Sequence, residues 1–518
     1  MTRWLHIANA RIWTADRSRP EATSVSISDG VITALDAPAE ACKGVPGGVE
    51  IIDAGGRIVI PGMIDAHAHL LMGGLSLAEL DLSGIRSRAA FEDAIARRHT
   101  ELEPGRWLIA GGWSEENWPG REQPDKTWLA AAGNRPVVCR RMDIHAALVN
   151  DAVLAMIDTT RDLAGGRIIR DQRGRPTGLM VESAAWELVN PRMPRPTVDV
   201  KREALRAAMA HYNRLGVTTV MSMEDLRDVE TVLAPMRGSL PLRICITLLD
   251  RGWPMDFDDG RDFPNDARLS VIGYKAFTDG TLGSRTAKMF EDYADDPGNR
   301  GLLVELAKEG HLKEWARGVV EAGLSPSVHA IGDEAAHLVL DAFEGLSTAR
   351  PLRIEHAQQL RPADIGRFRG LVASMQPLHK ADDARYALRR LGAARMNGFF
   401  AFRELLDAGA ILAFGSDWPV VEVDPMLGIR TAASGLTRDG VEFAPEHSIT
   451  VEEALRAYTA DAARALGRDD LGVLRAGAAG DFVMLDTDDM PSDWDPRNPG
   501  GRVVMTVVGG EVVYDGRS

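Results

Sequence analysis

The spacing of hydrophobic positions divides the chain into regions of different structure. Up to residue 57, short apolar runs separated by turn residues predict β-strands over 4–8, 11–13, 24–28, 31–34 and 49–52. The end of the chain has the same pattern, with strands predicted over 481–485, 503–508 and 511–514. Chain termini often lie close together. We therefore expect residues 1–57 and 470–518 to form one small β-sandwich domain.

Between residues 58 and 469, strand and helix patterns alternate. After an opening apolar strand, 58–66, the strands are predicted over 217–223, 242–249, 271–277, 327–331, 353–356, 371–376 and 411–416. Such alternation implies parallel βαβ units, and eight of them predict a TIM-like (β/α)8 barrel of the α/β class. A doubly wound open sheet is the alternative, but no GxGxxG motif follows an early strand.

One long segment, residues 72–198, interrupts the alternation. It is rich in tryptophan and contains the stretches Gly111-Gly112-Trp113 and Asn117-Trp118-Pro119-Gly120. A connection of this length should hold structure of its own, and such segments often shape a binding site. We expect an insertion within the barrel that acts as a lid or specificity subdomain.

Composition narrows the classes of partner. Acidic residues outnumber basic ones, and the net charge of −15 argues against nucleic-acid or membrane-surface partners. Cys42, Cys139 and Cys245 are too far apart and too few for a disulfide framework or a CxxC zinc site. Residues 1–14 lack the apolar core of a signal peptide, and no apolar run reaches the roughly 20 residues of a membrane span. We expect a cytoplasmic protein.

The opening strand ends in two histidines, His67 and His69. Side chains at positions i and i+2 point to the same side of a strand, so both rings can converge on one metal ion. Neutral imidazole suits zinc and other first-row divalent metals. By themselves, however, the two residues could be unrelated surface histidines.

Further candidate ligands lie at later strand ends, where barrel enzymes carry their catalytic groups. They are Lys275, His329, His356 and Asp417. With His67 and His69, six potential ligands fall at five strand ends, which favours a metal site over chance. Glu355 precedes a candidate ligand and should point to the other side of its strand, so we expect a structural role for it.

Several stretches of the chain resemble the amidohydrolase superfamily, and within it the amidohydrolase-3 or YtcJ-like group, which includes N-substituted formamide deformylase. The stretches are 61–69, 275–280, 283–286, 329–333, 354–358, 376–377, 415–419, 474–477 and 480–483. The resemblance covers nearly the whole chain, although it does not identify a substrate.

The resemblance implies a role for each ligand. His67, His69 and Asp417 would bind the more buried of two divalent metal ions, and His329 and His356 the second. Lys275 would bridge the two as a carbamate formed with CO₂. Zinc is the expected ion, in one or two copies, although iron, manganese, nickel or cobalt can occupy such sites. The alternatives are a salt bridge from Lys275 to Asp279 and a turn-capping role for Asp417.

The expected activity is hydrolysis of a C–N bond in an amide or formamide-type small molecule. Metal-activated water would attack the bond, with Asp417 as general acid and base. An isomerase or decarboxylase of the same superfamily is an alternative, as is a non-catalytic binding or scaffold protein on this fold. A homodimer is expected by analogy alone.

Five further residues are candidates for contact with the substrate: His145, His379, Arg285, Trp113 and Asp279. His145 belongs to the insertion and could reach the substrate from above the barrel. Arg285 could hold a substrate carboxylate, but an ordinary solvated loop arginine is equally compatible with the sequence. Trp113 could line an apolar pocket or form the core of the insertion.

Overall fold

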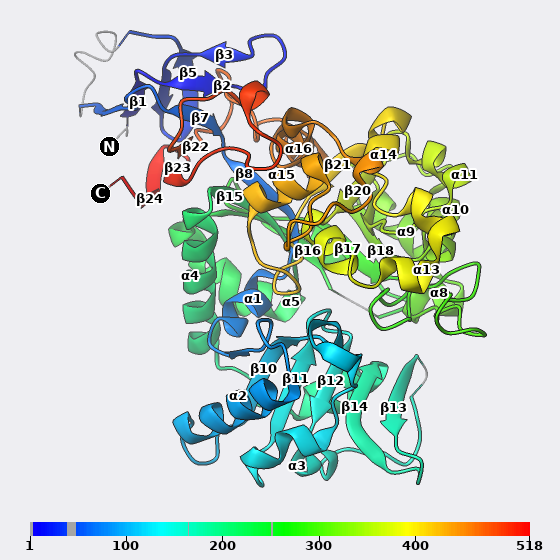
Figure 1. The fold of residues 1–518 in the computed structure, drawn as a ribbon. Coiled ribbons are helices and arrows are strands. Elements are labelled where there is room, and N and C mark those ends of the chain that lie inside the picture. Colours follow the sequence, from blue (N-terminus) through cyan, green and yellow to red (C-terminus); the bar gives the residue numbers. More distant parts are fainter. Residues whose placement is uncertain (1–3, 39–47, 164, 250–251, 518) are drawn as a thin grey trace.

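The computed structural model describes residues 4–38, 48–163, 165–249 and 252–517. A β-sheet unit made from both chain ends lies on one side of a barrel, and the insertion lies on the other side (Figure 1). Both chain ends lie in the β-sheet unit, whose strands are blue and red in the figure. Cys42 lies outside the described residues, and Cys139 and Cys245 are free thiols.

Two sheets form the terminal unit. The first has the order β5-β4-β1-β6, with β1 (Trp4–Ala8), β4 (Val25–Ser28), β5 (Val31–Leu35) and β6 (Glu50–Asp53). The second has the order β24-β23-β22-β7-β2-β3, with β2 (Arg11–Trp13), β3 (Glu21–Ala22), β7 (Ile58–Pro61), β22 (Phe482–Leu485), β23 (Val503–Val508) and β24 (Glu511–Asp515). Residues from both chain ends share one hydrophobic core, which includes Leu5, Ile27, Phe482 and Val507.

Eight parallel strands form the nearly closed barrel, which confirms the predicted fold class. They are β8 (Met63–Ala68), β15 (Val217–Glu224), β16 (Arg243–Leu248), β17 (Leu269–Phe277), β18 (Ser325–Ala330), β19 (Arg353–His356), β20 (Val372–Met375) and β21 (Ile411–Phe414). Each strand pairs with the next one in the sequence, and β8 and β21 lie at the two ends of the sheet. The order of strands in space therefore follows their order in the chain.

Side chains and close backbone contacts join β8 to the segment after β21. The Asp65 carboxylate accepts hydrogen bonds from the backbone N–H of Ser416 at 3.0 Å and from its hydroxyl at 2.5 Å. The Asp417 N–H donates to the His67 carbonyl oxygen at 2.7 Å. A Cβ on Gly415 would lie 2.5 Å from the His67 nitrogen, so only glycine permits this approach. The contacts fix two candidate ligands relative to each other.

The predicted opening strand 58–66 is two strands in different sheets. Residues 58–61 form β7 of the terminal unit and residues 63–68 form β8 of the barrel. Between them, the Gly62 N–H donates to the Asp481 carbonyl oxygen of the terminal unit at 3.0 Å. A Cβ at Gly62 would lie 2.1 Å from the Thr218 hydroxyl oxygen, so the crossing requires a residue without a side chain.

Helices that follow the barrel strands in the sequence surround the barrel (Figure 1). The main ones are α1 (Leu70–Ser76), α4 (Val198–Arg214), α9 (Leu312–Glu321), α10 (Asp333–Phe343), α12 (Pro377–Asp383), α13 (Ala387–Leu391), α14 (Phe402–Ala408), α15 (Pro425–Ser434), α16 (Val451–Ala457) and α17 (Ala460–Ala465). In α4, which the Thr197 side chain caps, Leu205, Met209 and Tyr212 form the buried face.

The insertion has its own six-stranded sheet, ordered β13-β14-β12-β11-β10-β9. Helix α2 (Arg88–Glu101) lies between β9 and β10 in the sequence. The strands are β9 (Leu80–Asp81), β10 (Leu108–Trp113), β11 (Val137–Arg141), β12 (Ala146–Val149), β13 (Gly166–Arg170) and β14 (Pro176–Glu182). Glu116 of the insertion accepts hydrogen bonds from Arg389 at 2.6 Å and from Arg390 at 3.1 Å, both on α13 of the barrel. These ion pairs dock the insertion against the barrel.

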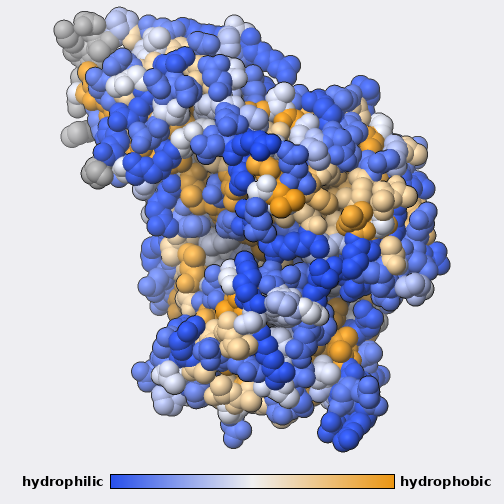
Figure 2. Space-filling view, viewed as in Figure 1, coloured by the Kyte–Doolittle hydropathy of each residue, from blue (hydrophilic) through white to orange (hydrophobic). Residues whose placement is uncertain are grey.

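The face of the molecule in Figure 2 is largely hydrophilic, with hydrophobic residues scattered among the polar ones. Across the described residues, no helix combines the length and the apolar character that crossing a membrane would need.

Candidate active site

A cavity of about 540 Å³ lies at the carboxyl ends of the barrel strands, and the insertion contributes part of its wall. All six predicted metal ligands line it: His67, His69, Lys275, His329, His356 and Asp417. His145 and His379, two of the predicted substrate contacts, line it as well. The volume is in the range of small-molecule sites.

Three of these residues form a compact cluster. Ligand atoms of His67, His356 and Asp417 all lie within 4.8 Å of one another. The distance from Asp417 Oδ1 to His67 Nε2 is 3.4 Å, and that to His69 Nε2 is 3.5 Å. Two atoms that each lie about 2.1 Å from one tetrahedral ion are about 3.4 Å apart. His67 Nε2 is buried without a hydrogen-bond partner among the described residues. The cluster therefore fits a divalent cation.

Side chains behind the cluster fix the orientation of two of its rings. His67 Nδ1 lies 2.6 Å from Glu355 Oε2, and Arg353 donates to the other oxygen of that carboxylate at 2.9 Å. His356 Nδ1 lies 2.8 Å from Gln376 Oε1. Metal-binding histidines typically use one ring nitrogen in this way, which leaves the other for the ion. In both rings Nε2 is the nitrogen that remains.

The position of Glu355 corrects the expectation that it points away from the ligands. Glu355 pairs in register with His329 on the neighbouring strand, so both side chains lie on the cavity side. Strand alternation would then turn His356 away from the cavity. The backbone of His356 has a φ of 73°, which breaks the alternation and brings its ring to the cavity too.

Burial and charge set the protonation of the cluster. Burial lowers the pKa of His69, His329, His356 and His379, which favours the neutral ring that a metal ion requires. Burial would raise the pKa of Asp417, but the His67 and His69 rings hold it well below its ordinary value. Asp417 is therefore ionised at neutral pH, as a metal-binding carboxylate must be.

His329 and Lys275 lie beside the cluster. His329 Nε2 lies 3.1 Å from the Gly280 carbonyl oxygen, so its other nitrogen, Nδ1, remains for a ligand. The His329 and His356 ring centroids are 4.6 Å apart. The Lys275 side chain is almost completely buried, and its Nζ lies 4.9 Å from the centre of the Phe277 ring. His329 therefore offers one further ligand atom next to the cluster, and Lys275 lines the same cavity.

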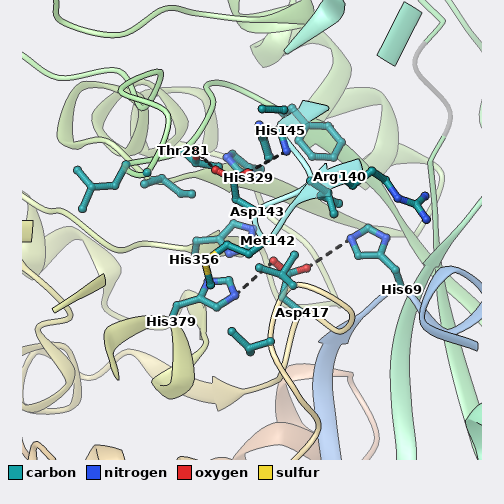
Figure 3. Close-up of a pocket in the computed structure, with 18 of the residues that line it drawn as sticks. His69, Arg140, Met142, Asp143, His145, Thr281, His329, His356, His379 and Asp417 are labelled. Atoms are coloured by element: carbon teal, nitrogen blue, oxygen red, sulfur yellow. Dashed lines mark hydrogen bonds and ion pairs between the residues drawn. The ribbon is translucent and has the colours of Figure 1, made fainter. Parts of the chain in front are cut away.

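His379 and His69 lie on either side of Asp417 (Figure 3). His379 Nε2 is 3.7 Å from Asp417 Oδ2, the oxygen that does not contact His67 and His69. The His379 ring stacks on the His356 ring, with an angle of 8° between their planes. His379 therefore contacts the carboxylate from the cavity wall.

The other predicted substrate contacts lie outside the cavity lining. Arg285 pairs with Asp295 at 2.8 Å. Trp113 is buried in the core of the insertion and donates from its indole nitrogen to the Cys139 carbonyl oxygen at 2.8 Å. The Asp279 carboxylate accepts backbone N–H groups from three residues. Each of these three side chains is thus bound to other groups of the protein and has a structural role.

Comparisons with known proteins agree with this geometry. A model of the family described as "Amidohydrolase family" matches residues 50–514. The chain is 36% identical to LONG AFTER FAR-RED 3 of Arabidopsis thaliana, over 98% of this chain and 91% of that protein. It is 32% identical to YtcJ of Bacillus subtilis, over 97% of this chain and 98% of that protein.

Two further similarities concern proteins with an activity in their names. The chain is 27% identical to N-substituted formamide deformylase of Arthrobacter pascens, over 93% of both proteins. Among solved structures, it is similar to an uncharacterized metal-dependent hydrolase from Pyrococcus horikoshii, with a TM-score of 0.76 and 27% identity. That similarity covers 96% of this chain and 99% of the other.

Proposed function

Because the chain belongs to the amidohydrolase family, we propose that it is a metal-dependent hydrolase that cleaves a C–N bond of an amide or formamide-type small molecule. The buried cluster of His67, His356 and Asp417 is the observation that carries this proposal. The similarities to a formamide deformylase and to a metal-dependent hydrolase support it.

The proposed ion is zinc, which His67, His69 and Asp417 would hold. His356, which the family resemblance assigns to a second ion, lies close enough to His67 and Asp417 to join them. When bound, such an ion activates water at neutral pH and polarises a carbonyl group. The four side chains supply three neutral imidazoles and one carboxylate, a donor set that zinc accepts. Glu355 and Gln376 orient two of the rings, so the ligands need little rearrangement to bind.

Asp417 is the proposed general base and acid. Its Oδ1 faces the ligand histidines, and its Oδ2 faces the cavity wall at His379. An ionised carboxylate in this position can orient the attacking water, accept its proton and deliver that proton to the leaving nitrogen. The carboxylate is ionised because the neighbouring rings hold its pKa low.

A second ion and a carboxylated Lys275 form a further part of the proposal. A lysine ammonium has no lone pair for a metal ion, whereas a carbamate offers two anionic oxygens. The burial of Lys275 and its place beside His329 in the cavity lining support this part. Elemental analysis provides the test, because a carbamate bridge should raise the metal count to two per chain.

Hydrolysis is tested with purified protein of known metal content. The substrates are a panel of N-formyl and N-acyl amines. We expect equal amounts of carboxylic acid and amine, with one oxygen from ¹⁸O-labelled water in the acid. Asp417→Asn should abolish turnover, and removal of the metal by a chelator should do the same reversibly. Product without solvent oxygen would indicate an isomerase or decarboxylase and contradict the proposal.

A further inference from the structure

One buried histidine of the insertion, His145, lines the cavity. The proposed reaction gives this histidine no role. His145 immediately precedes β12 and is 6% exposed. Its Nδ1 lies 2.7 Å from Oε2 of Glu182, at the end of β14. A ring whose Nδ1 faces a carboxylate has Nε2 as its remaining polar atom. Since His145 lines the cavity, that atom is the one available to a bound molecule.

Glu182 is a buried residue that contacts both the insertion and the barrel. It has no solvent exposure, and its second oxygen, Oε1, accepts a hydrogen bond from the Thr286 hydroxyl at 2.5 Å. Thr286 belongs to the barrel loop after β17. Glu182 thus fixes the insertion histidine relative to the barrel. Its backbone has a φ of 53°, a conformation that non-glycine residues adopt rarely.

The backbone before His145 is also held in an unusual conformation. Ile144 has a φ of 55°, which is a clear outlier for a β-branched residue. Its carbonyl oxygen accepts from the Trp186 indole at 3.1 Å, and the His145 N–H donates to the Asp143 carboxylate at 3.2 Å. Such conformations are energetically unfavourable and tend to persist at functional sites. The surroundings therefore pre-organise the His145 ring.

The His145 ring lies beside His329, whereas Asp417 lies in another part of the cavity lining (Figure 3). The ring centroids of His145 and His329 are 5.9 Å apart. In Figure 3, His145 and His329 lie together, away from Asp417 and His379. During attack on an amide, the carbonyl oxygen becomes negatively charged, so it should lie away from the Asp417 carboxylate and near hydrogen-bond donors. His145 forms an ion pair with the buried Glu182 carboxylate, and in that pair both ring nitrogens carry a hydrogen, so Nε2–H is a donor on that side.

We propose that His145 is a catalytic residue whose Nε2–H donates a hydrogen bond to the carbonyl oxygen of the substrate, with Glu182 as its positioning residue. The inference rests on the proposed function. It means that the barrel alone does not complete the site, because the insertion supplies a group that touches the reacting carbonyl.

Three variants test the roles of the two residues. In His145→Gln, kcat/KM for an N-formyl amine should fall about 10²–10³-fold, mainly in kcat, as on loss of an oxyanion donor. Glu182→Gln should produce a smaller loss, about tenfold, because the ring remains but its orientation and charge are less well fixed. Asp151→Asn, which breaks a surface ion pair of the insertion with Lys126, is the matched control and should behave as wild type. Metal content should be unchanged in all three variants.

A binding measurement separates this inference from the proposed hydrolysis. Benzoate, which presents a carboxylate oxygen and an apolar ring, serves as the probe in titration calorimetry with the metal-loaded protein. His145→Gln should weaken benzoate binding at least tenfold, whether or not any amide is hydrolysed. Equal affinity in wild type and variant, no benzoate binding to the wild type, or undiminished kcat/KM in the variant would each overturn the inference. A histidine-dependent affinity without hydrolysis would overturn only the proposed function.

Discussion

His67 Nδ1 and Glu355 Oε2 lie 2.6 Å apart, although 288 positions separate the two residues in the chain. Glu355 is completely buried, and burial would raise the pKa of its carboxyl. The Arg353 guanidinium and the His67 ring instead hold that pKa well below its ordinary value. An ionised carboxylate behind a ring increases the basicity of the opposite ring nitrogen. Glu355 thus connects the barrel interior to the metal-ligand cluster.

Replacing Glu355 with Gln should weaken metal binding about 10–100-fold, since loss of such a carboxylate removes both charge and ring orientation. Competition with a chelator measures the affinity. Glu404→Gln is the matched control, because Glu404 lies 2.8 Å from His447 Nδ1 in a similar pair outside the cavity lining. Equal metal affinity in the two variants would contradict the role assigned to Glu355.

Sequence patterns predicted the barrel and the candidate ligands because both depend on local signals. Apolar runs mark the strands, and strand ends mark the positions where His329, His356 and Asp417 enter the cavity. The orientation of Glu355 was predicted wrongly because it depends on register with a neighbouring strand and on the positive φ of His356. Neither can be read from one sequence. The buried pair Arg353 and Glu355, two positions apart on an apolar strand, was the available signal.

The insertion was harder to predict than the barrel. Its length and tryptophans indicated a structured segment, but Trp113 proved to lie in the core of the insertion. Which insertion residues face the cavity depends on how the whole segment docks, through contacts such as that of Glu116 with Arg389. The sequence pattern also predicted one strand over 58–66 where the structure has two. An apolar run does not reveal that its two halves join different sheets.

Asp65 should be essential for closing the barrel between β8 and β21. In Asp65→Ala, the Ser416 N–H and hydroxyl and the His67 N–H lose their acceptor. Buried donors without a partner cost about 1–3 kcal/mol each, so the free energy of unfolding in urea should fall by about 3 kcal/mol or more. Asp65→Asn keeps one acceptor oxygen and should lose less. Wild-type stability of Asp65→Ala would contradict this role.

Glu224 should make stability depend on pH. Burial raises the pKa of its carboxyl from 4.5 to about 7, despite hydrogen bonds from the Leu71 N–H and the Ser222 hydroxyl. The folded state therefore holds the proton more tightly than the unfolded state. Glu224 therefore adds to the free energy of unfolding below pH 4.5, and this contribution is lost as pH rises towards 7. Its full size is on the order of 3 kcal/mol.

Glu224→Gln should consequently flatten the plot of unfolding free energy against pH between 5 and 8. Urea unfolding at several pH values provides the measurement, and Glu309→Gln, at an exposed position, is the control. A slope identical to that of the wild type would show that Glu224 does not titrate in this range.

Lys275→Ala should reduce the metal count without unfolding the protein. If Lys275 bridges two ions, the wild type should contain two metals per chain and the variant at most one, because His67, His69 and Asp417 remain. Elemental analysis with a circular dichroism spectrum measures both properties. A wild type that holds a single metal, with the same content in the variant, would remove Lys275 from the proposed ligand set.

Metal titration of the metal-free protein, with hydrolysis of an N-formyl amine as the readout, tests the central claim most directly. The account predicts no turnover without metal and a rate that rises in proportion to bound metal until the cluster of His67, His356 and Asp417 is filled. Turnover that persists in the metal-free protein would contradict the account, as would a fully loaded protein that hydrolyses no compound of the amide panel.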